Sequence, residues 1–246
     1  MEVHAHSHTE RKKWTHYFWE FFMLFLAVTL GFFVENQREH YVEHKREKQY
    51  MRSMMKDLYT DLENIELTKT EKERMIKFGD SIIQLYINGD YQSHTGYFYY
   101  YARNFSTYQN LFFMTDGTLI QLKNSGALRL IRKLSVVDSL QAYDNVYNQF
   151  RRSQDRESEF LADYRETMSK VFDIKVFNEM VITFSDIVMP GGNPSIFNED
   201  KQLINELLVK VHIARRNRLG SVRYLNRLKE KANNLIAMIK KEYHLE

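Results

Sequence analysis

The chain has 246 residues with a formal net charge of +3, no cysteine, 2 prolines and 9 glycines. A chain without cysteine forms neither disulfides nor thiolate metal sites, and its nearly balanced charge gives no broad positive field for nucleic acid. So few helix-breaking residues predict long helices. We therefore expect an all-α protein, with an N-terminal transmembrane helix that continues into an extended, coiled-coil-like bundle of long helices.

Residues 1–13 are expected to form a flexible, histidine-rich tail. His4, His6 and His8 form an H-x-H-x-H pattern, which can hold Ni²⁺, Cu²⁺ or Zn²⁺ when it lies in a flexible segment. Chain termini are usually unordered, so the favoured interpretation is a cytoplasmic tail without a metal ion. We expect no other cofactor in this protein.

Residues 14–34 are expected to form the transmembrane helix. Glu20 is the only charged residue between Tyr17 and Val34, and a run of this length covers most of a hydrocarbon core of ~30 Å. Aromatic residues near its start, such as Trp14, suit the depth of the lipid headgroups. A cleaved signal peptide is the alternative, but it ends in small residues, whereas this run ends in the bulky sequence LGFFVEN. We therefore expect a retained signal anchor.

Cations that flank the span predict its orientation. Arg11, Lys12 and Lys13 precede it, whereas Arg38 alone follows it within ten residues. Cytoplasmic flanks carry the excess of lysine and arginine. The N-terminus is therefore predicted to be cytoplasmic and residues 35–246 periplasmic, in a single-pass protein held by the lipid of the bacterial inner membrane.

Glu20 lies on the same predicted helix face as Ala27 and Gly31, since residues seven and eleven apart differ by about 20°. Ala27 and Gly31 form a small-xxx-small pair, which lets two helix backbones approach closely. A carboxyl group on that face is expected to meet protein rather than lipid, so the span would pack against copies of itself or a partner helix. The alternative is that Glu20 lies near enough to the headgroups to reach water.

A possible zinc-binding pattern follows the span. His40, Glu43 and His44 spell H-x-x-E-H, the inverzincin pattern, in which two histidines four residues apart bind zinc and a glutamate acts as base. The match lies in a run of alternating charges with no predicted cleft, and a solvated helix of this composition produces it readily. We therefore expect neither catalysis nor a metal site at this position.

Residues 35–246 are expected to form one extramembrane helical domain with three long helices, over about 35–78, 135–173 and 199–243. The first is expected to end near Gly79. It carries apolar residues at alternating spacings of four and three, which is a bundle or coiled-coil pattern. These residues are Met51, Met55, Leu58, Leu62 and Ile65.

The segment 174–198 is predicted to be the main connection, since it holds both prolines and the only Gly-Gly pair. The helix that begins near residue 135 is expected to return toward the membrane. That direction would put the apolar sequence VFNEMVITF of the connection near the membrane surface, where it could rest on lipid or on a partner.

Polar residues interrupt the apolar stripes of the last two long helices. If these helices form an antiparallel hairpin, counting heptads from the connection puts Glu157 opposite Arg218, with Gln154 and Arg215 close by. Such a layer can fix the register of a bundle. The alternative is that Arg215 and Arg218 anchor a small carboxylate or phosphate in a pocket, but buried charges are usually paired, so the internal pair is favoured.

Two stretches resemble a known family. The sequence YFWEFFMLFLAVTLGFFVENQREHYVEHKREKQYMRSMMKDLYTDL and the later LIQLKNSGALRLIRK are similar to an uncharacterised Bacteroidetes family of single-span membrane proteins, classed as a domain of unknown function. The resemblance covers roughly the first half of the chain. It implies a retained anchor and a helical domain, and it brings no established activity or catalytic residues.

These observations predict a protein without catalytic activity. We expect a membrane-anchored helical scaffold or accessory subunit that forms a homo-oligomer or docks on another envelope membrane protein. The alternative is a periplasmic, sensor-like bundle that binds a small anion and acts through a partner. No nucleic acid partner is expected, because the basic stretches lie on amphipathic helices and are offset by nearby acids.

Overall fold

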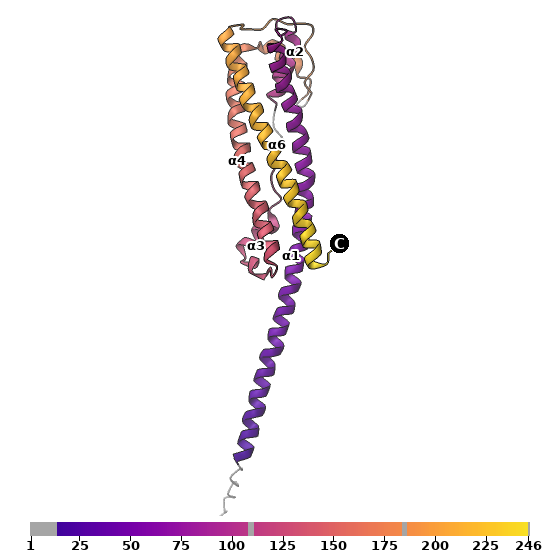
Figure 1. Cartoon of the computed structure of the whole chain (residues 1–246), viewed down its shortest axis with the longest axis vertical. Helices are drawn as coiled ribbons and strands as arrows, with labels where there is room; N and C mark the ends of the chain where they lie inside the picture. Colours follow the sequence, from indigo (N-terminus) through magenta and orange to yellow (C-terminus); the bar gives the residue numbers. More distant parts are fainter. Residues whose placement is uncertain (1–13, 108–110, 184–185, 246) are drawn as a thin grey trace, which may run out of the picture. The chain divides into compact units, whose positions relative to one another are not determined.

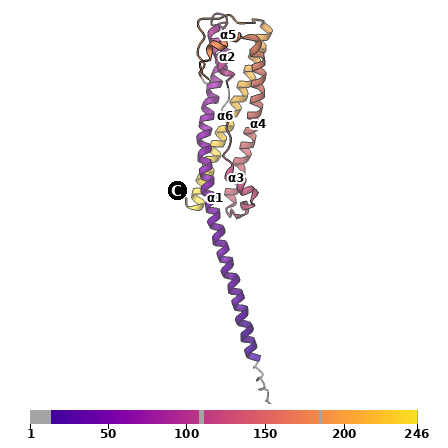
Figure 2. The same ribbon diagram turned by 180° about the vertical axis from the view of Figure 1, so that it is seen from behind.

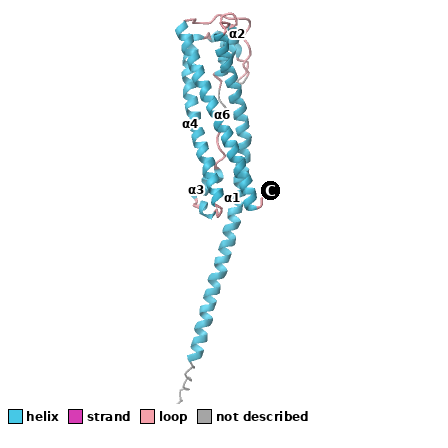
Figure 3. Cartoon of the chain, in the orientation of Figure 1, coloured by secondary structure: helices cyan, strands magenta, loops and turns pink. Residues whose placement is uncertain are grey.

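The computed structural model of the chain describes residues 14–107, 111–183 and 186–245. The chain divides into two compact units, Met1–Tyr50 and Met51–Glu246, and helix α1 (Trp14–Ile87) begins in the first and ends in the second. The described residues form helices joined by loops (Figure 3). Among them the only β-type pairing is one isolated bridge, between Val181 and Ile187. The predicted all-α class is therefore confirmed.

Three long helices lie side by side in the second unit: α1 from Met51 onward, α4 (Leu134–Val171) and α6 (Lys201–Tyr243) (Figures 1 and 2). Helices α4 and α6 begin and end within two residues of the predicted boundaries. Asp200 caps the start of α6, where its carboxylate accepts a hydrogen bond from the backbone N–H of Leu203 at 2.9 Å.

Short helices cover the two ends of this unit. Helices α2 (Thr95–Phe105) and α5 (Ile174–Met180) lie at the end where α1 stops, and α3 (Gly117–Asn124) lies at the other end (Figures 1 and 2). A 3₁₀ turn, Ala127–Leu130, follows α3.

Helix α1 passes through Gly79, where the sequence predicted a break, and ends eight residues later. A Cβ atom at Gly79 would lie 2.8 Å from a ring carbon of Phe105, so this glycine allows α2 to approach α1 closely. The chain instead turns at Gly89, which has a φ of +75°, a conformation that glycine adopts without steric cost. The glycine at position 79 therefore serves helix packing and does not end the helix.

Helix α4 runs parallel to the part of α1 in this unit, and not back along it as the sequence predicted. The two helices make contacts in the same order along the chain: Tyr143 donates to Asp61 at 2.6 Å, and Lys72 donates to Glu157 at 2.7 Å. The connection 174–198 therefore lies at the end of the unit where α1 stops. The expected position of VFNEMVITF near the membrane surface depended on the opposite direction, so it loses its basis.

The apolar stripe of α1 is used within the chain's own bundle. Met51, Met55, Leu58 and Ile65 are buried, so their heptad spacing reports intramolecular packing. This stripe gives no support to self-association through a coiled coil.

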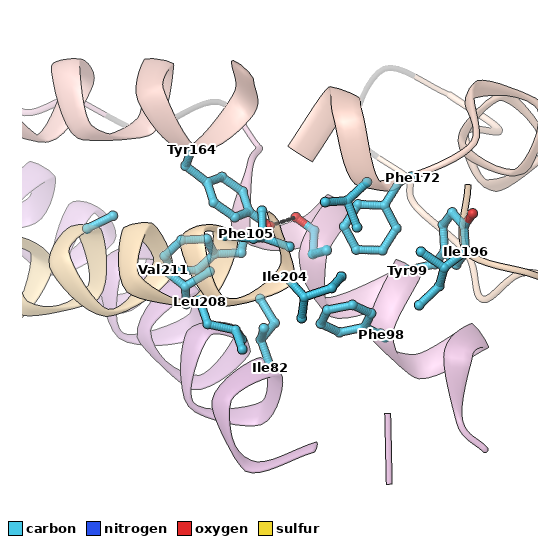
Figure 4. Close-up of a cluster of buried hydrophobic side chains, with 14 of the residues drawn as sticks. Ile82, Phe98, Tyr99, Phe105, Tyr164, Phe172, Ile196, Ile204, Leu208 and Val211 are labelled. Carbon is cyan, nitrogen blue, oxygen red and sulfur yellow. Dashed lines mark hydrogen bonds between the residues drawn. The ribbon is translucent and has the colours of Figure 1, made fainter. Parts of the chain in front are cut away.

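Aromatic side chains form a large core cluster where α1, α2, α4 and α6 meet (Figure 4). The ring of Phe172 lies 5.1 Å from that of Phe98 and 4.8 Å from that of Tyr99, and the rings of Phe105 and Tyr164 meet edge to face at 5.1 Å. Such ring pairs add to the free energy gained from burial. The cluster therefore fixes α2 and the connection onto the long helices.

A pair of glycines offers a test of this packing. A Cβ atom at Gly96 would overlap the backbone oxygen of Gly192, so Gly96→Ala is expected to destabilise the bundle by about 1–3 kcal/mol through overpacking. Gly220 lies inside α6 with open space around the position of a Cβ atom, so Gly220→Ala is expected to stabilise it by up to about 1 kcal/mol. Thermal unfolding of both variants followed by circular dichroism checks the two signs, and equal shifts would contradict this packing.

Candidate functional site

A fully buried cluster of charged side chains joins the three long helices. The carboxylate of Glu157 on α4 accepts hydrogen bonds from Lys72 on α1 at 2.7 Å and from Arg218 on α6 at 3.0 Å. The exposed fractions of the three residues are 0% for Glu157, 3% for Lys72 and 0% for Arg218. One carboxylate therefore holds a cation from each of the two neighbouring helices.

Further polar contacts surround this cluster. Ser221 donates to Glu157 at 3.2 Å, and its hydroxyl lies 3.1 Å from that of Ser153. A second nitrogen of Arg218, Nη2, donates to the backbone oxygen of Phe105 at 3.2 Å, and the guanidinium lies 4.4 Å from the centre of the Phe105 ring. Arg218 thus links α6 to α4 and to the end of α2 through its hydrogen bonds and a cation–π contact.

The cluster holds two cations against one carboxylate. Burial lowers the pKa of Lys72, and the nearby charge of Arg218 lowers it further, while Glu157 opposes both effects. Burial also lowers the pKa of Arg218, and its Nη1 atom has no hydrogen-bond partner among the described residues. Because buried charges are costly to desolvate, such a cluster is better suited to fixing the register of the helices than to adding stability.

The expected contact between Glu157 and Arg218 is present, but Gln154 and Arg215 bond to other groups. Gln154 is buried, and its side-chain amide exchanges two hydrogen bonds with the backbone of Phe112, at 2.9 and 3.0 Å. Arg215 forms an ion pair with Asp80 of α1. The four residues therefore do not form a single polar layer.

Sequence reasoning missed Lys72, although a signal was present. Lys72 lies seven residues after Ile65, at the same heptad position of the α1 stripe, and a polar residue there marks an interruption of the kind already noted on α4 and α6.

Asp61 was also missed. It is 1% exposed and accepts hydrogen bonds from the Tyr143 hydroxyl at 2.6 Å and from the backbone N–H of Thr115 at 2.7 Å. Burial raises the pKa of the Asp61 carboxyl despite these two bonds, and burial next to Asp61 raises the pKa of Tyr143 as well. Together with Gln154, these groups hold the extended segment 111–116 against α1 and α4.

The predicted anion pocket of Arg215 and Arg218 is not formed by these side chains. Arg218 is fully buried against Glu157, and Arg215 is held by Asp80, so each guanidinium faces a carboxylate of the same chain. A small anion would have to compete with these carboxylates for the same donors.

The histidines after the span lie beside glutamates one turn away on the same helix. His40 lies 3.9 Å from Glu43, and His44 lies 3.2 Å from Glu47. Within the described ranges, no three histidine or acidic side chains gather in a way that could hold a metal ion. His4, His6 and His8 lie outside the described residues.

The first unit contains the apolar part of α1. By length and composition this stretch could cross a membrane, and none of it is buried within the chain. Glu20 lies 3.2 Å from His16, one turn earlier, and a Cβ atom at Gly31 would have open space around it. Ala27 is exposed on the same helix. The two small residues and Glu20 thus lie on one uncovered helix face.

No family model, curated protein or solved structure matches this chain.

Proposed function

We propose that residues 14–34 anchor this protein in the bacterial inner membrane as a single span, and that the bundle acts as a non-catalytic scaffold or accessory subunit. In this proposal the N-terminus is cytoplasmic and the bundle is periplasmic, by the positive-inside rule. One observation carries the proposal: the apolar side chains of this stretch are exposed throughout. In water such a surface would be highly unfavourable, whereas lipid and other membrane helices would cover it.

Assembly in the membrane is the second part of the proposal. Glu20, Ala27 and Gly31 share one face of α1, where small residues let another helix approach closely. The carboxylate of Glu20 is costly in lipid unless it meets a polar partner. His16 provides one partner within the helix, and we expect a neighbouring helix to pack against the same face.

The competing sensor function finds less support. Its two arginines are paired with Glu157 and Asp80, so a small anion would have to compete with these carboxylates. The charged cluster instead joins the three long helices, which suits a rigid spacer or scaffold.

Native mass spectrometry of the full chain, extracted gently from its own membranes, tests the proposal. We expect either a multiple of the 29.7 kDa chain mass or a reproducible additional mass from a companion protein. Two variants are expected to reduce that assembly. Glu20→Leu removes the carboxylate that a partner helix would meet, and Gly31→Leu adds a side chain that keeps the two helix backbones apart. Leu67→Ser, at a 65% exposed position in the bundle, is the control that should retain it.

The bundle itself should stay folded in these variants, since Gly31 has open space around it. A single copy of the wild-type chain in the extract, with no companion, would contradict the assembly. An unchanged mass in both span variants would exclude the face of Glu20, Ala27 and Gly31 as the contact.

A further inference from the structure

The connection 174–198, which includes α5, exposes several apolar side chains. Ile174 is 75% exposed, Phe197 is 71% exposed and Ile182 is 68% exposed. Val181, Val188 and Met189 are between 37% and 40% exposed. Clusters of exposed apolar residues in one segment are typical of interaction sites.

Hydrogen bonds and buried neighbours hold this segment in place. The backbone N–H of Asn198 donates to the oxygen of Val171 at 3.2 Å, which holds the residue before it, Phe197, near the end of α4. Tyr99 donates to the backbone oxygen of Ser195 at 2.9 Å. Its hydroxyl also accepts from the N–H of Asp173 at 3.0 Å.

The buried side of the same segment explains the arrangement. Ile196 and Phe172 point into the aromatic cluster together with Tyr99 (Figure 4), and Met180 is fully buried. Phe172, Met180 and Ile196 are therefore residues of this part of the chain that pack into the core. Ile174, Ile182 and Phe197 are additional apolar residues that the fold leaves outside.

The segment is also acidic. Residues 173–201 contain Asp173, Glu179, Asp186, Glu199 and Asp200 against Lys175 and Lys201, a net charge of −3, whereas the whole chain carries +3. An interface of this charge attracts a cationic partner and repels anionic lipid. A second copy that docked through the same surface would place like charges opposite each other.

We infer that Ile174, Ile182 and Phe197, together with Glu179 and Glu199 of the same acidic segment, form a docking surface for an apolar, lysine- or arginine-rich segment of a partner protein. We call these five residues the connection surface. The inference rests on the proposed function, since it names the kind of protein on which an accessory subunit would dock. Apolar side chains would supply the contact area, and the two glutamates would select the partner's charge.

Two matched peptides test the chemistry on the full chain in nanodiscs of zwitterionic lipid. Both peptides are amphipathic helices of the same length and apolar content, and their polar positions hold lysine in one and glutamate in the other. We expect only the lysine peptide to bind. Binding should weaken by at least about tenfold in Ile174→Ser/Phe197→Ser, and likewise in Glu179→Lys/Glu199→Lys. Leu134→Ser is the control, because Leu134 is equally exposed, at 75%, at the start of α4.

A crosslinking experiment in native membranes identifies the occupant. The chain has no cysteine, so Phe197→Cys gives a single thiol for a benzophenone label, and Leu134→Cys gives its control. We expect light to join the label at position 197 to a peptide of another protein that is rich in apolar and basic residues, with no such product at position 134. Adducts with lipid, with a second copy of this chain or with an acidic segment would overturn the inference.

The outcomes separate this inference from the proposed function. If the additional mass of a companion persists in Ile174→Ser/Phe197→Ser, the scaffold function stands and the connection surface is wrong. If the wild-type chain shows no assembly at all, the scaffold function fails, and the peptide measurement still decides the surface. Equal binding of the two peptides, or equal loss in Leu134→Ser, contradicts the inference directly.

Discussion

Replacing Glu157 with leucine should lower the free energy of unfolding by about 3–5 kcal/mol, the usual cost of removing one partner from a buried ion pair. The variant leaves Lys72 and Arg218 buried without the carboxylate that both contact. Denaturant unfolding of the full chain in detergent, followed by circular dichroism, measures the loss. Glu159→Leu is the matched control, because Glu159 lies on the outer face of the same helix and such surface changes usually alter stability by under about 0.5 kcal/mol.

The triple variant Lys72→Met/Glu157→Leu/Arg218→Met should recover most of that loss. It replaces the whole cluster by apolar side chains of similar volume, which is often neutral or stabilising in proteins. A single variant no less stable than Glu159→Leu would show that the cluster is not buried as described. A triple variant as unstable as the single one would mean that packing, and not unpaired charge, causes the loss.

Two arginines in the apolar stretch of α1 should release the protein from the membrane. Leu24→Arg and Val28→Arg lie near the middle of residues 14–34, where each arginine costs about 2.5–3.5 kcal/mol on the insertion scale. We expect the wild-type chain to stay in the membrane pellet after alkaline carbonate treatment, and the double variant to appear in the soluble fraction. Immunoblotting of the two fractions measures the distribution.

The control for that experiment carries the same added charge outside the stretch. Tyr41 and Leu67 are 71% and 65% exposed, so Tyr41→Arg/Leu67→Arg should stay in the pellet. A wild-type chain that is already soluble in carbonate would contradict the span. Retention of the Leu24→Arg/Val28→Arg variant would show that another part of the protein holds it in the membrane.

The helical repeat of apolar residues predicted the bounds of α4 and α6 and the pairing of Glu157 with Arg218. The stripes on α4 and α6 predicted both helices to within two residues of their ends, because a 3.6-residue repeat reports directly which positions are buried. Heptad counting from the connection also brought Glu157 opposite Arg218, since neighbouring antiparallel helices of equal rise keep their register over several turns.

Periodicity did not reveal which neighbour covers a buried face. Gln154 was expected beside the charged pair, yet it binds the backbone of Phe112 in an extended segment that has no helical repeat of its own. Arg215 was expected in the same layer, yet it reaches Asp80 on α1. An apolar stripe shows which side of a helix faces the core. It does not show whether that side packs against one of the two other long helices or against the segment 111–116.

By itself, the sequence determined the helical class, the apolar stretch of α1, the extent of α4 and α6, and one buried ion pair. Only the tertiary structure decided the direction of α4, the inclusion of Lys72 in the cluster and the role of Gly79. An extended chain advances about 3.3 Å per residue against 1.5 Å in a helix. Phe112 contacts Gln154 and Thr115 contacts Asp61, so residues 111–116 run along the bundle toward the end where α3 lies and α4 begins. No helical pattern records that return, because it depends on side chains of α1 and α4 that hold an extended backbone between them.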